Sequence, residues 1–165
     1  MERRALRAVL DGDVAAFDQV VLEGFDPLSS ANADRWTLLH RALISVVLAP
    51  APSMVQHLIG LGVDVNAKDR HGWTALHLAA RGRWVGAMEV LLDAGALVDP
   101  VNDEGFTPLR LTLLKKPINA EATELLLRRG ADKRIPATKG ISVEDYVKVI
   151  AHGDNAFLLD LFARY

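Results

Sequence analysis

The fold is decided by the stretch DRHGWTALHLAARGRWVGAMEVLLDAGALVD, residues 69–99. Thr74 stands just before an apolar-periodic run, so its hydroxyl can accept a backbone N–H at the start of a helix over about 75–82. A second apolar run predicts another helix over about 85–93, and Gly95 supplies the left-handed residue that ends it. The stretch therefore predicts one helix–turn–helix unit followed by a loop.

The same unit recurs along the chain. One marker is a threonine that follows an aromatic residue, in the segments WTLLH (36–40), WTALH (73–77) and FTPLR (106–110). The other marker is a glycine after a leucine-rich run, at Gly62, Gly95 and Gly130. Both markers have a period of about 33 residues, which predicts a stack of structural repeats.

The stretch 69–99 resembles an ankyrin repeat, with the family pattern D-x-x-G-x-T-P-L-H-x-A-A…L-L…G-A-x-V. The matching positions are Asp69, Gly72, Thr74, Leu76, His77, Ala79, Ala80, Leu91, Leu92, Gly95 and Ala96. The chain departs at Ala75, where the family has proline, and at Gly82, to which the helix-turn glycine is displaced. The resemblance covers essentially the whole chain, and implies an all-α ankyrin-repeat solenoid of about five helix-turn-helix units with N- and C-terminal caps.

We expect a single domain over residues 1–165. Its units are predicted at about 2–31, 32–68, 69–101, 102–134 and 135–165. Prolines at 50 and 52 are expected to end a long first helix in the second unit.

Local signals predict the helix starts within these units. Asp13, Ser53, Ser142 and Asp154 are each expected to cap the helix that follows. Arg35 stands where the family has glycine, which predicts a distorted loop at that position.

Composition excludes several classes of protein. The absence of cysteine excludes disulfides, thiolate metal sites and a cysteine nucleophile. A net charge of −2 gives no general attraction to nucleic acid or to anionic membranes. The most apolar stretch, 38–62, is interrupted by two prolines and cannot span a bilayer as one helix. We expect a cytoplasmic protein, monomeric when free, with neither a nucleic-acid nor a membrane partner.

No catalytic, cofactor or metal site is predicted. The segment GLGVDVN (60–66) is a helix end rather than a phosphate-binding turn. His40 and His77 fall in the family's helix-start slot, where the resemblance implies a local hydrogen bond, and no histidine pair has metal-ligand spacing. We therefore expect a protein that is not an enzyme.

Three aromatic residues occupy the same slot in successive units. Trp36, Trp73 and Phe106 each precede the marker threonine, on a turn where a large ring is hard to bury. Each ring either folds over a neighbouring loop and shields its backbone, or belongs to a stripe that binds a partner. Three rings in register favour the stripe, because aromatic residues dominate interface hot spots.

The resemblance implies that partners bind a concave face made of loop tips and first helices. Polar residues at those places are predicted to surround the stripe: Asp34, Arg70, His71, Arg81, Asp103, Glu104 and Lys115. Their mixed charges favour a specific protein partner, since a polyanion would need a dominant basic stripe.

The predicted function is therefore a protein-protein interaction module, because stacks of this kind rarely carry chemistry. One interpretation is a dedicated inhibitor, such as a bacterial immunity protein that neutralises a toxin enzyme. Stand-alone size favours it over the alternatives, which are an adaptor or scaffold and an enzyme with an unrecognised site. The inserted loops at 49–53 and 115–121 are a second candidate binding surface.

Overall fold

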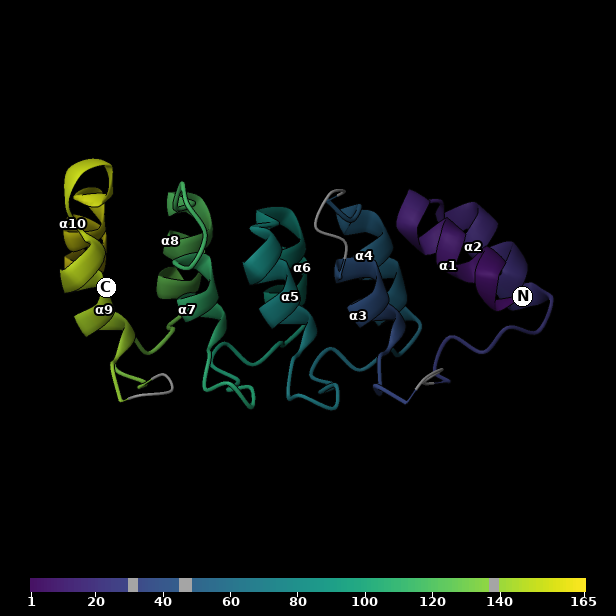
Figure 1. Ribbon diagram of the computed structural model, residues 1–165. Coiled ribbons are helices and arrows are strands. Elements are labelled where there is room, and N and C mark those ends of the chain that lie inside the picture. Colours follow the sequence, from purple (N-terminus) through teal and green to yellow (C-terminus); the bar gives the residue numbers. More distant parts are fainter. Residues whose placement is uncertain (30–32, 45–48, 137–139) are drawn as a thin grey trace.

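The computed structural model describes residues 1–29, 33–44, 49–136 and 140–165. Its helices form five pairs stacked side by side in a row, with the two chain termini in the pairs at opposite ends (Figure 1). Within the described ranges there is no strand, only an isolated bridge between Pro136 and Ser142. The structure thus confirms the expected all-α solenoid of helix-turn-helix units.

Each pair consists of a first helix and a second helix. In chain order the pairs are α1 (Glu2–Asp11) with α2 (Val14–Leu22), α3 (Leu38–Leu43) with α4 (Pro52–Gly60), α5 (Ala75–Gly82) with α6 (Val85–Asp93), α7 (Pro108–Thr112) with α8 (Ala120–Arg128), and α9 (Val143–Ile150) with α10 (Phe157–Arg164). A short 3-10 helix, η1 (Gly153–Asn155), precedes α10. First helices contact first helices from α1 to α7, and second helices contact second helices from α2 to α8. The core therefore runs through the stack without a break.

Small residues let the helix pairs approach one another closely. Ala79 and Ala80 on α5 are fully buried, as the sequence predicts. Met88 and Leu91 on α6 are fully buried as well and fill the space between neighbouring pairs. Burial of a side chain of this size contributes roughly 1.5–3 kcal/mol, so the contacts between units stabilise each unit in turn.

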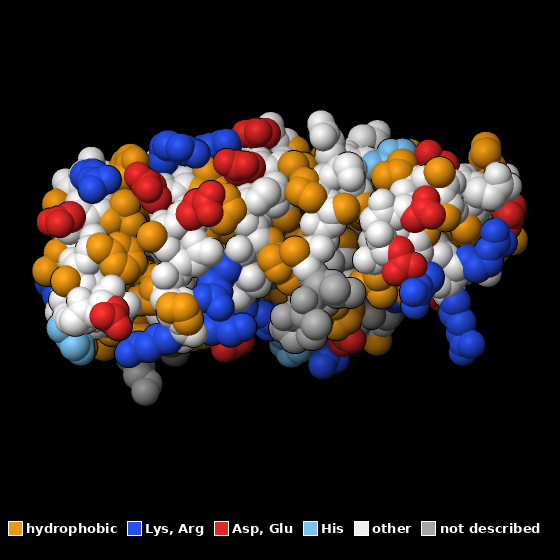
Figure 2. All heavy atoms as spheres, turned by 90° about the horizontal axis from the view of Figure 1, so that it is seen from above, with side chains coloured by type: hydrophobic (Ala, Val, Ile, Leu, Met, Phe, Trp, Pro, Cys, Tyr) orange, Lys and Arg blue, Asp and Glu red, His pale blue; other side chains and the backbone are white. Residues whose placement is uncertain are grey.

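On the face seen in Figure 2, the apolar side chains of the described residues do not gather into one continuous band. Figure 2 shows acidic, basic and hydrophobic side chains interspersed over the side seen from above. No helix in the parts of the chain that the structure describes is long and apolar enough to cross a membrane.

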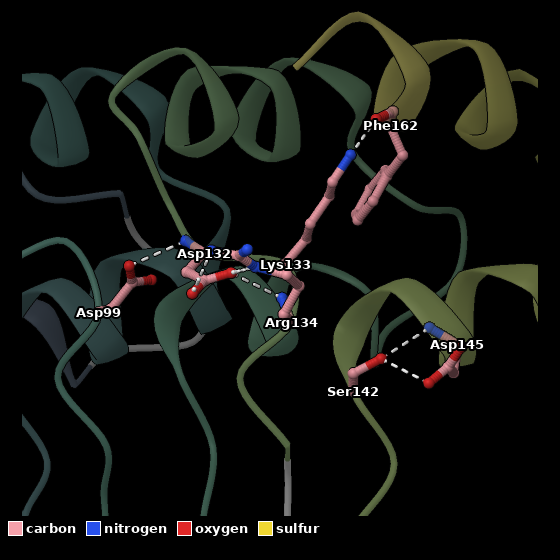
Figure 3. A network of polar contacts seen from close by, with 7 residues as sticks. All are labelled: Asp99, Asp132, Lys133, Arg134, Ser142, Asp145 and Phe162. Atoms are coloured by element: carbon pink, nitrogen blue, oxygen red, sulfur yellow. Dashed lines mark hydrogen bonds and ion pairs between the residues drawn. The ribbon is translucent and has the colours of Figure 1, made fainter.

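Several predicted helix caps are confirmed. The Asp13 carboxylate accepts the backbone N–H of Ala16 at 2.9 Å and starts α2. Thr74 caps α5 through the N–H of the third helical residue. The Ser142 hydroxyl oxygen accepts the N–H of Asp145 at 3.0 Å at the start of α9 (Figure 3). Each such bond satisfies one of the backbone donors left open at a helix start.

Other predicted helix starts are wrong. Ser53 does not cap α4, because the helix already begins at Pro52, whose missing N–H makes it a favourable first residue. The first helix of that unit is short and ends at Leu43, well before the prolines. Asp154 lies within η1, and α10 begins after Ala156 with no side-chain cap.

The C-terminal pair is tied to the fourth unit by polar contacts (Figure 3). The Lys133 ammonium donates to the backbone oxygen of Phe162 at 2.7 Å, near the end of α10. The Asp99 carboxylate accepts the N–H of Asp132 at 2.9 Å, which joins the loops of two successive units. Burial raises the pKa of the Asp99 carboxyl. The Lys133 bond thus holds the terminal pair in addition to apolar packing, and the Asp99–Asp132 bond holds the fourth unit to the third.

The backbone of Arg35 itself is not distorted, contrary to the prediction from sequence; residues 30–32 of the same loop lie outside the described ranges. Arg35 adopts φ 62°, close to the values of Gly72 (74°) and Gly105 (76°) in the corresponding loops. Arg35 therefore adopts the left-handed conformation that glycine has in the neighbouring loops, and this conformation strains an L-residue. After α5, likewise, the left-handed residue is Arg83 (φ 62°) rather than the displaced glycine at 82.

Replacing Arg35 with glycine is expected to raise the free energy of unfolding by about 1 kcal/mol, because the left-handed conformation costs an L-residue energy. Arg35 is exposed, so little packing is lost with its side chain. Urea unfolding followed by circular dichroism measures the change. Arg83→Gly is the matched control: it has the same φ, but its guanidinium donates to the Pro117 carbonyl, and that loss offsets the gain. An Arg35→Gly protein no more stable than wild type would contradict the strain.

Candidate functional site

The loops that carry Trp73 and Phe106 are each built around a buried side chain at the same position. Asp69 Oδ1 accepts the backbone N–H groups of His71 and Trp73 at 2.8 and 2.9 Å. Asn102 Oδ1 accepts the N–H groups two and four residues further on, at 3.1 and 2.8 Å. These contacts fix the backbone of the aromatic residue in each loop, so the rings are presented by rigid turns.

The two helix-start histidines hold the next loop in place. The Nδ1 atoms of His40 and His77 accept the N–H of the threonine three residues earlier, at 3.2 and 3.1 Å. The remaining nitrogen, Nε2, therefore carries the proton and donates to the backbone oxygens of Trp73 (2.9 Å) and Phe106 (3.0 Å). Burial lowers the pKa of both histidines, that of His77 to about 4, and keeps the imidazoles neutral. Their role is structural, in agreement with the local hydrogen bonding that the resemblance implies.

The loop tips are linked from one unit to the next. The N–H of Arg70 donates to the Asp34 carbonyl, and the N–H of Asp103 donates to the His71 carbonyl, each at 3.0 Å. Arg70 Nε also lies 3.0 Å from the Asp34 carboxylate and 2.9 Å from the His71 ring. Four of the predicted rim residues thus form a ladder along the tips, in which the Arg70 charge already has a partner.

A groove of about 320 Å³ lies between the ends of α5 and α7, and we name it the α5–α7 groove. It is lined by Trp73, Arg81, Glu104, Phe106, Leu111, Leu114 and Lys115. Five of these were predicted from sequence as site residues: Trp73, Arg81, Glu104, Phe106 and Lys115. The two aromatic side chains are half-buried, and Leu114 is 45% exposed although it is apolar. The Arg81 guanidinium stacks on the indole of Trp73, 4.9 Å from the ring centroid.

Trp36 does not line this groove. It lies in a separate groove of about 300 Å³ between α1 and α3, lined by Leu6, Val9, Leu10, Trp36, Arg41 and Ile44. Its indole N–H donates to the Asp69 carboxylate at 3.3 Å, across to the next loop. The three aromatic residues share a slot in the repeat, as predicted, but two line one groove and the third lines another.

The two inserted loops differ in their relation to the groove. In the 115–121 insertion, Lys115 lines the groove itself, Arg83 donates to the Pro117 carbonyl, and Ile118 is only 9% exposed. Asn119 then caps α8 by accepting the N–H of Ala122 at 2.9 Å. The residues of the 49–53 insertion lead directly into α4 and line no part of this groove.

Sequence reasoning missed the two leucines of the groove. Leu111 is buried and forms part of its floor, and Leu114 stands at its edge. The signal was the pair of adjacent leucines at 113 and 114, because a helix end can bury only one of two neighbours. Leu113 is 2% exposed, so Leu114 is the one that faces outward.

Nothing in the described part of the chain assembles ligands for a metal. No group of three or more histidine, aspartate or glutamate side chains there could hold an ion. The groove offers apolar contact, aromatic stacking, hydrogen bonding and charge.

The sequence matches a family profile and several known proteins. The sequence profile of ankyrin repeats (3 copies) matches residues 43–137, more than half of the chain. The human B-cell lymphoma 3 protein is 36% identical over 76% of this chain, and the match covers 28% of that protein. The mouse RelA-associated inhibitor is 38% identical over 56% of this chain and 11% of its own length. The human mitochondrial disaggregase is 39% identical over 48% of this chain and 11% of its own length. The chain thus spans less than a third of these relatives.

Proposed function

The chain belongs to the ankyrin-repeat family, a family of protein-protein interaction modules, and we propose that it binds a protein partner through the α5–α7 groove. The observation that carries this proposal is the groove itself. Trp73 and Phe106 are held half-buried by rigid loops beside the exposed Leu114. A partner side chain that enters the groove would remove all three from water.

The energetics of interfaces support this choice of surface. Aromatic residues that are buried near the centre of an interface contribute roughly 2 kcal/mol or more each. The loops are preorganised by Asp69 and Asn102, so little conformational entropy is lost when a partner binds. The polar ladder along the loop tips lies on the same side of the stack and would form part of the rim.

Within this function we favour the role of a dedicated inhibitor. One relative carries that role in its name, the RelA-associated inhibitor. If the partner is an enzyme, the simplest mechanism is occlusion, in which the stack covers the mouth of the active site. Titration of the captured partner's activity against this protein tests the role: equimolar loss of activity supports inhibition, and undiminished activity in a stable complex favours an adaptor.

Trp73→Ala is expected to weaken partner binding about thirtyfold or more, because truncation removes a central apolar anchor. The partner is first captured from the source cell on the immobilised wild-type protein and identified by mass spectrometry. It is then purified and titrated against the variant by calorimetry. The indole also contacts the His77 ring and packs on the core, so a smaller loss of stability is expected, and binding is measured well below the melting midpoint.

The matched control is Leu22→Ala, which removes an apolar side chain that is 82% exposed on α2, away from the groove. It should leave affinity unchanged. Equal affinity for wild type and Trp73→Ala, with a lower melting midpoint for the variant, would show that the indole shields the loop and that the partner binds elsewhere.

A further inference from the structure

The cations around the α5–α7 groove are not neutralised by the protein itself. Arg81 and Lys115 line the groove, and Lys116 follows directly; none of them forms an ion pair within the described ranges. Arg70, in contrast, is paired with the Asp34 carboxylate.

Arg81 is held in a geometry suited to a carboxylate. Its guanidinium carbon lies over the Trp73 ring, 4.9 Å from the ring centroid, so a cation–π contact holds the group near the indole. The planar guanidinium presents N–H donors along its edge, and two of them match the two oxygens of a carboxylate. Carboxylate binding to Arg81 would therefore occur directly beside the apolar floor.

The lysines are held at the edge of the same groove. Arg83 donates to the carbonyl of Pro117, and the buried Ile118 anchors the segment that follows. The backbone around Lys115 and Lys116 is thus tied both to α5 and to the core. Little backbone entropy is therefore lost around these two positive charges when a partner binds.

We propose that the α5–α7 groove binds a linear acidic segment of the partner. A large apolar side chain of that segment enters between Trp73 and Leu114, and an aspartate or glutamate close to it pairs with Arg81. Further carboxylates face Lys115 and Lys116. This inference rests on the proposed function and names the chemistry of the segment that the groove accepts.

Nucleic acid fits the same groove less well. Glu104 lines the groove and would repel phosphate, and the protein as a whole has a net charge of −2. Phosphate backbones are bound by longer basic tracts than these three cations provide. An apolar side chain flanked by carboxylates complements both the apolar floor of the groove and the cations around it.

A random-peptide phage library, selected on the immobilised full chain and counter-selected on Trp73→Ala, tests the inference. We expect enriched peptides in which aspartate or glutamate lies within one helical turn of leucine, isoleucine, methionine or phenylalanine. Enriched, Trp73-dependent peptides without acidic residues would overturn the inference and leave the proposed function standing. The absence of any Trp73-dependent peptide would overturn it too, while capture of a folded partner still tests the proposed function separately.

Charge variants give the second measurement, with one enriched peptide synthesised and labelled with fluorescein. Arg81→Gln is expected to weaken its binding about tenfold or more, because a charge-assisted hydrogen bond is lost. Glu104→Gln removes a negative charge from the groove and should therefore strengthen binding a few-fold. Affinity should fall as salt is raised. Unchanged affinity in Arg81→Gln, or full displacement of the peptide by a single-stranded oligonucleotide at equal concentration, would contradict the proposal.

Discussion

Leu91→Ala is expected to lower the free energy of unfolding by about 2–5 kcal/mol, through lost burial and the cavity that remains. Leu91 is fully buried on α6, a helix that contacts α4, α5 and α8. The truncated side chain therefore weakens the packing of its own unit and the interfaces with both neighbours. Urea unfolding followed by circular dichroism measures the loss.

The control for this variant is Leu97→Ala in the loop of the same unit. Leu97 is 60% exposed, so its truncation should change stability by no more than about 0.5 kcal/mol. Equal midpoints for Leu91→Ala and wild type would mean that the register assigned to α6 is wrong.

The shape of the unfolding curve carries further information. In a short stack each unit is stabilised mainly by its neighbours, so the chain should unfold in close to a single transition. The loss caused by Leu91→Ala should then appear as a shift of the whole curve rather than as a new early phase.

The fold could be predicted from sequence because its signals are local and repeated. A capping threonine and a helix-ending glycine recur about every 33 residues, and each has a direct structural cause. The errors arose where two local signals compete. Ser53 has the chemistry of a cap, but Pro52 is better suited to be the first helical residue, so the helix starts two positions earlier, with Ala51 as its N-cap.

Backbone conformation is a second point at which sequence reasoning failed. An arginine where glycine is usual predicted a distorted loop at Arg35. The hydrogen bond from the Arg70 N–H to the Asp34 carbonyl, together with packing of the stack, holds Arg35 in the left-handed conformation of its glycine counterparts. Tertiary contacts therefore outweighed the local preference, at the cost of strain.

The candidate site could be predicted only in part. The repeat placed Trp36, Trp73 and Phe106 in one slot, but it carried no information on how each ring leans toward the neighbouring unit. That depends on the first helices on either side, which make one groove with Trp73 and Phe106 and another with Trp36. Leu114 lines the groove because its neighbour Leu113 is buried, so that the side chain of Leu114 faces outward.

Burial of the helix-start histidines makes the stack sensitive to acid. His77 is fully buried, and its pKa falls from 6.5 to about 4, chiefly because burial penalises the charged imidazole. Its hydrogen bonds to backbone oxygens and the nearby Asp69 act in the opposite sense but are outweighed, and Lys68 adds to the decrease. Between these two pH values the unfolded chain binds a proton that the folded chain does not.

The free energy of unfolding is therefore expected to decrease as the pH is lowered from about 6.5 to about 4, by roughly 3 kcal/mol for His77 alone. His40, whose pKa is also lowered by burial, adds to the loss, whereas the raised pKa of Asp99 opposes it. Urea unfolding of wild type and His77→Gln at pH 7 and pH 4.5 separates these contributions. Glutamine cannot restore both imidazole hydrogen bonds, so the variant should be less stable at pH 7; it cannot take up a proton, so it should lose less on acidification. If both proteins lost the same amount between the two pH values, the acid sensitivity would arise from groups other than His77.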